Sequence, residues 1–66
     1  MPEVNDEKFY IYFSQGSWVK SDDYCTITEI ADDGFCYMAE DHIWIAGDDT
    51  FDSAASAQVE CDVRNA

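Results

Sequence analysis

Length, composition and charge already narrow the classes to which this chain can belong. The 66 residues include 15 acidic and 3 basic side chains, and the formal net charge is −12. Repulsion by phosphates therefore disfavours binding to DNA, RNA or an anionic membrane surface, and a basic partner is favoured. With 47% hydrophobic and 15% aromatic residues, the chain is not a disordered acidic tail, because such tails carry few aromatic residues.

Aromatic and β-branched residues in the first three quarters of the chain predict strands divided by turns. Residues 1–7 are polar and acidic, and we expect them to form a flexible acidic tail. The predicted strands cover residues 8–13, 24–31, 35–39 and 42–46. A further short strand, 18–20, is expected to pair back on the first of them.

Two turns set the expected register of the sheet. Asp32-Asp33-Gly34 suits a three-residue hairpin loop with Gly34 in the left-handed conformation. Glu40-Asp41 suits a tight two-residue connection. One sheet face then carries the aliphatic set Ile30, Cys36, Met38, Ile43 and Ile45. The opposite face carries Cys25, Ile27, Glu29, Phe35, Tyr37 and Trp44.

The first strand should divide between the same two faces. We expect the aliphatic face to lie under the helix, joined by Phe9, Ile11 and Phe13. Tyr10 and Tyr12 would then lie on the aromatic face.

After Thr50 the apolar residues follow a helical spacing. They form a narrow stripe of Phe51, Ala54, Ala55, Val59 and Val63. Asp49 or Thr50 can cap the start, and Arg64 stands near the end, where the helix dipole favours a cation. These features predict a helix over 51–64. Residues 1–66 are therefore expected to form one α+β domain, an antiparallel β-meander of about four strands with one C-terminal helix packed on one sheet face.

The motifs of enzymes and metal sites are missing. His42 is the only histidine, and the three glycines are isolated rather than gathered in a phosphate-binding loop. Asp48, Thr50 and Asp52 have the alternating spacing of an EF-hand, but the glycine and the final glutamate of that loop are absent. We expect no enzyme, no cofactor and no metal site, with a calcium site of another geometry as the alternative.

The cysteines and the short apolar runs indicate in which cellular compartment the protein is expected. Cys25, Cys36 and Cys61 are odd in number and lack CxxC spacing, which favours reduced thiols in a cytoplasmic protein over one disulfide with a free thiol. No apolar run has the length of a signal peptide core or a membrane span.

The chain has five acidic doublets, and the four after Asp6-Glu7 recur every eight to ten residues, one at each predicted strand end. Alternate turns of a meander lie at opposite ends, so Asp22-Asp23 and Glu40-Asp41 should share one end. Asp32-Asp33 and Asp48-Asp49 should share the other, about 17–20 Å away. The alternative is that acids are simply good turn residues that keep a small protein soluble. A similar choice between core and half-exposed interface applies to Tyr10, Tyr12, Tyr37 and Trp44.

A very small acidic α+β domain with carboxylates arrayed over its surface resembles the phage-encoded DNA mimics. Among these are anti-CRISPR proteins that inhibit Cascade-type complexes, including the type I-C inhibitors. The resemblance implies competition for a basic nucleic-acid-binding protein, such as the large DNA-recognising subunit of a type I Cascade, in the cytoplasm of a host bacterial cell. The eight doublet acids and the four aromatic residues named above would form the contact surface.

Two other functions are consistent with the same residues. An immunity or antitoxin-like protein that neutralises a basic toxin or nuclease would use the same charge. A small domain that dimerises through the aromatic face would use the rings instead, so both a monomer and a homodimer are open. None of these hypotheses involves direct binding to nucleic acid or membranes.

Overall fold

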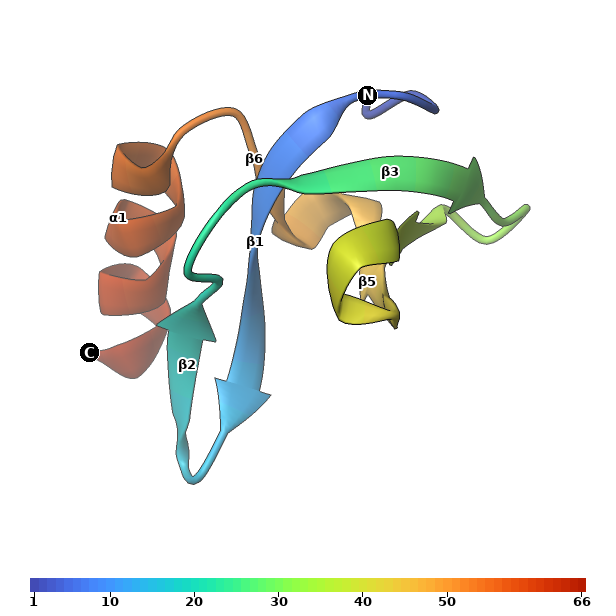
Figure 1. Cartoon of the computed structure of the whole chain (residues 1–66). Coiled ribbons are helices and arrows are strands. Elements are labelled where there is room, and N and C mark those ends of the chain that lie inside the picture. The colour runs from blue at the N-terminus through green and yellow to red at the C-terminus, as the bar shows by residue number, and fades with distance from the viewer.

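An antiparallel sheet and one α-helix make up the structure, a computed structural model that describes all 66 residues (Figure 1). The strands are β1 (Glu7–Ser14), β2 (Ser17–Lys20), β3 (Cys25–Ile30), β4 (Phe35–Met38), β5 (Ile43–Ala46) and β6 (Thr50–Phe51). The helix α1 spans Ala54–Asn65, and the 3-10 turns η1 and η2 span Ala39–Asp41 and Gly47–Asp49. The strand order is β2-β1-β3-β4-β5, with β6 also on β1, which confirms the predicted α+β class with a C-terminal helix.

Strand β1 joins the parts of the fold because it pairs with three other strands. Its last four residues pair with β2, its first two with β3, and the two between them with β6. In Figure 1, β3 crosses β1 at a steep angle, with α1 and β5 on opposite sides of β1. The hairpin β1–β2 with α1 and the meander β3–β4–β5 are therefore two halves that share β1.

The start of the chain is bonded to the sheet rather than forming a tail over all of residues 1–7. The amide of Asn5 donates to the carbonyl of Ile27 at 2.7 Å, and the amide of Ile27 donates to the carbonyl of Asp6 at 2.8 Å. Glu7 already belongs to β1. The free backbone groups of β3 thus pair residues 5–7, although their side chains are polar.

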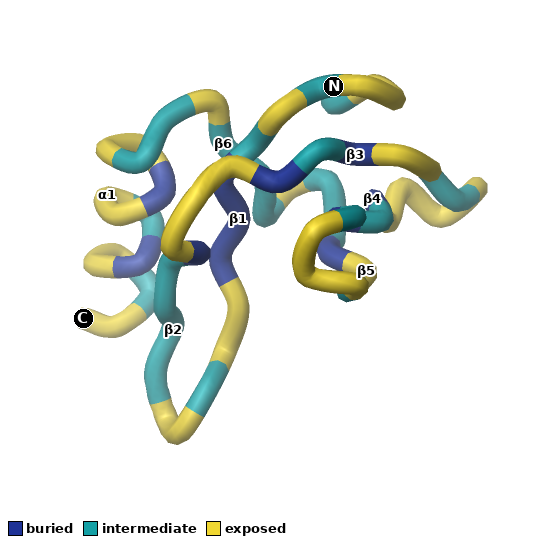
Figure 2. Tube along the Cα trace, viewed as in Figure 1, coloured by how far each residue is buried: buried dark blue, intermediate teal, exposed yellow.

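Two separate hydrophobic clusters lie on opposite faces of β1 (Figure 2). One cluster, in the meander half, comprises Tyr10, Cys25, Ile27, Cys36, Met38 and Ile45. The other, under α1, comprises Phe9, Ile11, Ala57 and Cys61. Neighbouring residues of a strand point to opposite faces, so Phe9 and Tyr10 enter different clusters.

The helix therefore covers a different surface from the one predicted. The aliphatic set of β3–β5 packs on Tyr10, whereas α1 packs on β1, β2 and β6. Tyr10 is a core residue rather than part of the aromatic face, and Phe13, expected under the helix, is 62% exposed.

The predicted loop registers are confirmed, and one bulge explains the remaining error. Ile30 pairs with Cys36 and Met38 with Ile43, as the two proposed loops require. The register shifts between Ile27 and Glu29, so one extra residue turns the start of β3 over. Cys25 and Ile27, predicted on the outer face, consequently lie in the core.

Helix α1 begins later and is rotated relative to its predicted stripe. The hydroxyl of Ser53 accepts from the amide of Ser56 at 3.1 Å and caps the helix, whereas Phe51 belongs to β6. The buried positions are Ala57 and Cys61. The predicted stripe residues Val59 and Val63 are exposed.

Candidate partner-binding surface

All three cations lie outside the meander half, and each is engaged within the molecule. Lys8 pairs with Asp52, and Arg64 pairs with Asp49 and Glu60, each at 2.9 Å. Lys20 donates to the carbonyl of Ser21 and lies over the ring of Phe9. None of them is free to neutralise the acids of the meander.

Residues 21–48, which we call the acidic lobe, contain no lysine or arginine. They include β3, β4, β5 and the connections between them. Their carboxylates are Asp22, Asp23, Glu29, Asp32, Asp33, Glu40, Asp41 and Asp48. Eight of the fifteen acids thus lie in one continuous segment whose only potential cation is His42.

The prediction that two of the doublets share one end of the sheet is confirmed. Asp22-Asp23 and Glu40-Asp41 line the same cavity of about 260 Å³, together with Tyr10, Tyr12 and Tyr24. Buried Ser21 fixes the first doublet, because its hydroxyl accepts from the amide of Tyr10 and donates to the carbonyl of Asp23, both at 3.1 Å.

Hydrogen bonds hold the carboxylates of the second doublet. The Glu40 carboxylate accepts from the amide of Thr26 at 2.6 Å and from its hydroxyl at 2.8 Å, and these bonds lower the pKa of Glu40. The Asp41 carboxylate accepts from the Tyr10 hydroxyl at 2.5 Å and from the Cys25 thiol at 3.3 Å, and the pKa of Asp41 falls for the same reason. Both groups are anions in fixed positions at neutral pH.

The two groups that donate hydrogen bonds to Asp41 have raised rather than lowered pKa values. Burial, and then the bond to Asp41, raises the pKa of the Cys25 thiol to about 12. The same two causes raise the pKa of the Tyr10 hydroxyl. Neither group supplies a nucleophile at neutral pH, since the thiolate is the reactive form of cysteine.

At the opposite end of the lobe the predicted acids also lie near one another, with the exception of Asp49. Asp33 and Asp48 line a cavity of about 190 Å³ beside Gly34 and Gly47, where the amide of Gly47 donates to the carbonyl of Gly34 at 3.1 Å. Asp32 is exposed in the same turn. Asp49 instead turns toward α1, where it pairs with Arg64, and it is withdrawn from the candidate surface.

The distance between the two acidic ends follows from strand length. Strand β3 has six residues, whereas β4 and β5 have four. The strands therefore span about 13–20 Å. The predicted separation of the two acidic ends, about 17–20 Å, assumed strands of five or six residues, so the four-residue strands β4 and β5 bring the ends closer together.

The four predicted aromatic residues divide between core and surface. Tyr10 is only 5% exposed and its hydroxyl is bound to Asp41, so it offers very little surface to a partner. Tyr12 and Trp44 are exposed, and Tyr37 is half-buried with its ring centroid 5.1 Å from that of Trp44.

Two exposed rings of the acidic lobe are absent from the predicted contact set. Phe35 is exposed beside Trp44, and Tyr24 is exposed at the cavity of the first end. For Phe35 the signal was available, because strand alternation had already placed it on the face of Tyr37 and Trp44. For Tyr24 the sequence offers no such signal, because the pattern predicts it as the first residue of the strand 24–31. In the structure Tyr24 lies in the connection before β3.

Three further observations concern metal ions, thiols and the membrane. No group of three or more histidine, cysteine or acidic side chains is arranged to hold a metal ion. All three cysteines are free and buried. The α-helix is too short and too polar to cross a bilayer. Comparison of the chain with known protein families, with curated proteins and with solved structures found no match.

Proposed function

We propose that this protein is an acidic DNA mimic that occupies the basic nucleic-acid-binding site of another protein and blocks access of DNA. The observation that carries the proposal is the acidic lobe, in which eight carboxylates meet no lysine or arginine of their own chain. Carboxylates that have no cationic partner in their own chain are available to the lysines and arginines of a DNA-binding cleft.

The dimensions of the molecule suit a cleft that accepts a duplex. The long axis extends 31 Å and the two shorter axes 20 Å, so the net charge of −12 amounts to one charge per about 2.6 Å. Duplex DNA carries one charge per about 1.7 Å of its axis. The protein therefore presents a charge density of the same order as DNA on a body of comparable width.

The partner that we propose is the large DNA-recognising subunit of a type I Cascade, in the cytoplasm of a host bacterial cell. This choice rests on the resemblance to phage-encoded anti-CRISPR proteins in size, charge and placement of acids. A basic toxin or nuclease would present the same chemistry, and inhibition of such an enzyme, with no effect on Cascade, would favour an immunity protein instead.

Competition with DNA tests the proposal most directly. Asp22, Asp32 and Asp48 are exposed, and none of their carboxylates takes part in the hydrogen bonds or ion pairs of the structure. Replacing the three by asparagine removes charge from both acidic ends without breaking an internal contact. We expect the triple variant to displace DNA from purified Cascade at least tenfold less well, and the wild-type protein to lose potency as salt rises.

A matched variant separates placement from total charge. Glu3→Gln, Glu7→Gln and Asp62→Asn change the net charge by the same amount at exposed positions outside the acidic lobe. This control should retain most of the potency. Equal losses in the two triple variants, or undisturbed DNA binding in the presence of the wild-type protein, would contradict the proposal.

A further inference from the structure

The outer face of β4 and β5 carries an aromatic surface that no part of the chain covers. Phe35 and Trp44 are 41% and 42% exposed, and Tyr37 pairs directly with Trp44 across the two strands. Helix α1 packs on β1, β2 and β6, and Figure 1 shows it on the other side of β1. Large rings gathered on an exposed sheet face are typical of binding surfaces.

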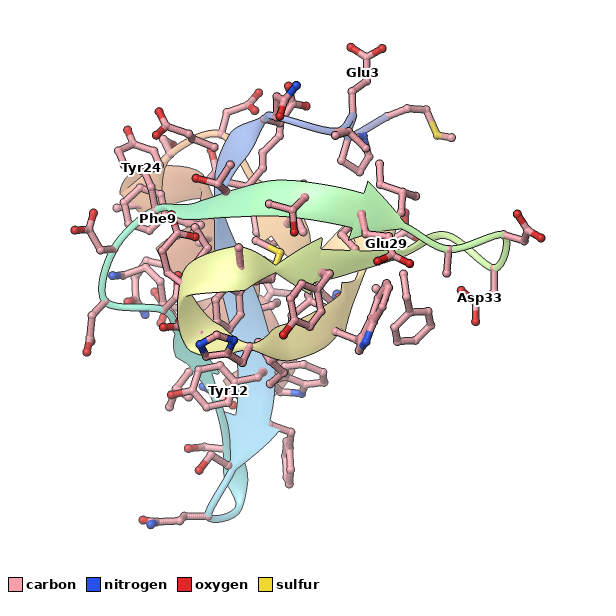
Figure 3. The ribbon with its side chains drawn as sticks, turned by 45° about the vertical axis from the view of Figure 1, so that its right-hand side comes forward. Glu3, Phe9, Tyr12, Tyr24, Glu29 and Asp33 are labelled. Carbon is pink, nitrogen blue, oxygen red and sulfur yellow. The ribbon has the colours of Figure 1, made fainter.

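This surface is hollowed and rimmed by carboxylates. The hollow is a shallow depression of about 330 Å³, widely open to solvent and lined by Ala31, Asp33, Phe35 and Trp44. Glu29 lies beside Tyr37 in the neighbouring strand. Figure 3 shows Glu29 and Asp33 toward the same end of β3 and the turn that follows it. The Glu29 carboxylate takes part in none of the structure's hydrogen bonds or ion pairs and is exposed.

A ring face combined with a carboxylate suits one cationic side chain better than any other. The guanidinium of arginine is planar and weakly hydrated, stacks on aromatic rings, and donates two parallel hydrogen bonds to a carboxylate. The ammonium of lysine is compact and strongly hydrated, so it gains less from the same pocket. The same chain already places Arg64 over the ring of Trp18, at 4.5 Å.

We infer that the open depression between Phe35 and Trp44 receives an arginine side chain of the basic partner, with Asp33 as its counter-ion. The inference rests on the proposed function and adds to it the means by which one basic surface is distinguished from another. A second copy of this chain is the poorer occupant, because two molecules of charge −12 would bring the Glu29 and Asp33 rims together.

Two peptides of equal charge separate this inference from the general attraction of cations. We would titrate the protein with hexa-arginine and with hexa-lysine and follow the indole NMR signals of Trp18 and Trp44. Both peptides should bind, since both are polycations. Hexa-arginine should bind about fivefold more tightly and should shift the indole signal of Trp44 at its saturating concentration.

Variants locate the preference for arginine. Trp44→Ala should bring the ratio of the two affinities close to one, and Asp33→Asn should reduce it. Phe13→Ala, which removes an exposed ring from the β1–β2 hairpin, should leave the ratio unchanged. Amide spectra of each variant establish that it is folded.

The outcomes distinguish failure of the inference from failure of the proposed function. Equal binding of the two peptides, an unmoved Trp44 signal, or an unchanged ratio in folded Trp44→Ala would overturn the arginine pocket while leaving the acidic mimic intact. If neither peptide bound at low salt, the arginine pocket and the proposed acidic mimic would both be overturned.

Discussion

At the scale of single residues, the contact between Tyr10 and Asp41 connects the core to the acidic surface. Tyr10 is buried among the aliphatic residues of the meander, while its hydroxyl reaches the carboxylate of exposed Asp41. A charge-assisted bond of this kind is stronger than one between neutral groups. It fixes the orientation of a surface anion from inside the fold.

Replacing Tyr10 by phenylalanine should therefore act on both stability and charge. We expect the free energy of unfolding to fall by about 1–2 kcal/mol at neutral pH, because a hydrogen bond to a charged group is lost. The pKa of Asp41 should rise toward its ordinary value, which a pH titration of its carboxyl signal by NMR would record.

The pH dependence of this loss has a defined direction. A carboxylate whose pKa is lowered by folding stabilises the protein above its ordinary pKa of 3.8, and the contribution disappears as pH falls through the lowered value. Denaturant unfolding of the two proteins should thus differ at pH 7 and converge as pH falls below the ordinary pKa of Asp41 and through its lowered value. A constant difference across this range would argue against the ionised contact.

At the scale of elements, the end of α1 is attached to the edge strand β2 by side chains rather than by backbone pairing. The amide of Trp18 donates to Oδ1 of Asn65 at 2.7 Å, and Nδ2 of Asn65 donates to the carbonyl of Trp18 at 2.9 Å. The side chain of Asn65 thus bonds both the amide and the carbonyl of Trp18 on the edge of β2, as the backbone of a neighbouring strand would. Together with Arg64, which lies over the ring of Trp18, this contact joins the last turn of the helix to β2.

Removal of this attachment should loosen the last turn of α1. Asn65→Ala loses both bonds, and we expect the free energy of unfolding to fall by about 1–2 kcal/mol, with faster hydrogen exchange for the amides of the last helical turn. Gln58→Ala is the control, because Gln58 bonds only to Asp62 within the helix. Equal effects of the two substitutions would show that Asn65 contributes no tertiary contact.

The same elements show what the sequence could and could not predict. The turn chemistry around Gly34 and at Glu40-Asp41 was sufficient to set the pairing of β4 with both neighbours, because short loops determine register. The bulge near Thr28 leaves no mark in a run of β-branched residues, and it displaced Cys25 and Ile27 to the other face.

Burial on α1 and around β1 depended on contacts between distant segments. Val59 and Val63 match a helical stripe as well as Ala57 and Cys61 do, and only the packing of Ala57 and Cys61 in the cluster with Phe9 and Ile11 distinguishes the two faces. For the candidate surface, too, only part of the arrangement could be predicted from the sequence. Pairing of the acidic ends followed from topology, whereas the loss of Tyr10 to the core and of Asp49 to Arg64 required the folded arrangement.

At the scale of the whole molecule, positive and negative charge are separated. The acidic lobe repels itself, while the three basic residues are engaged around β1, β2 and α1. Repulsion within one region opposes the compact state. The surface proposed to bind a partner is therefore also the part of the fold that is destabilised by its own charge.

Salt should accordingly stabilise this protein. Raising sodium chloride from about 0.01 M to about 1 M shortens the Debye length from about 30 Å to about 3 Å, and we expect Tm to rise by about 5 °C, which corresponds to about 1 kcal/mol. The variant with asparagine at positions 22, 32 and 48 should have a higher Tm at low salt and a smaller response. Differential scanning calorimetry would test both, and a Tm that falls with salt would show that the ion pairs outweigh the repulsion.

The position of the few basic residues also determines how the chain can be cut and coupled. A trypsin-like protease finds no cleavage site from Ser21 to Val63, so cleavage at Lys20 and Arg64 releases the whole acidic lobe within one fragment. Amine-directed cross-linkers reach only the amino terminus, Lys8 and Lys20. A carbodiimide, which joins a carboxylate to an amine, would find no lysine within the lobe itself, so the couplings of the lobe would report mainly on lysines of the bound partner.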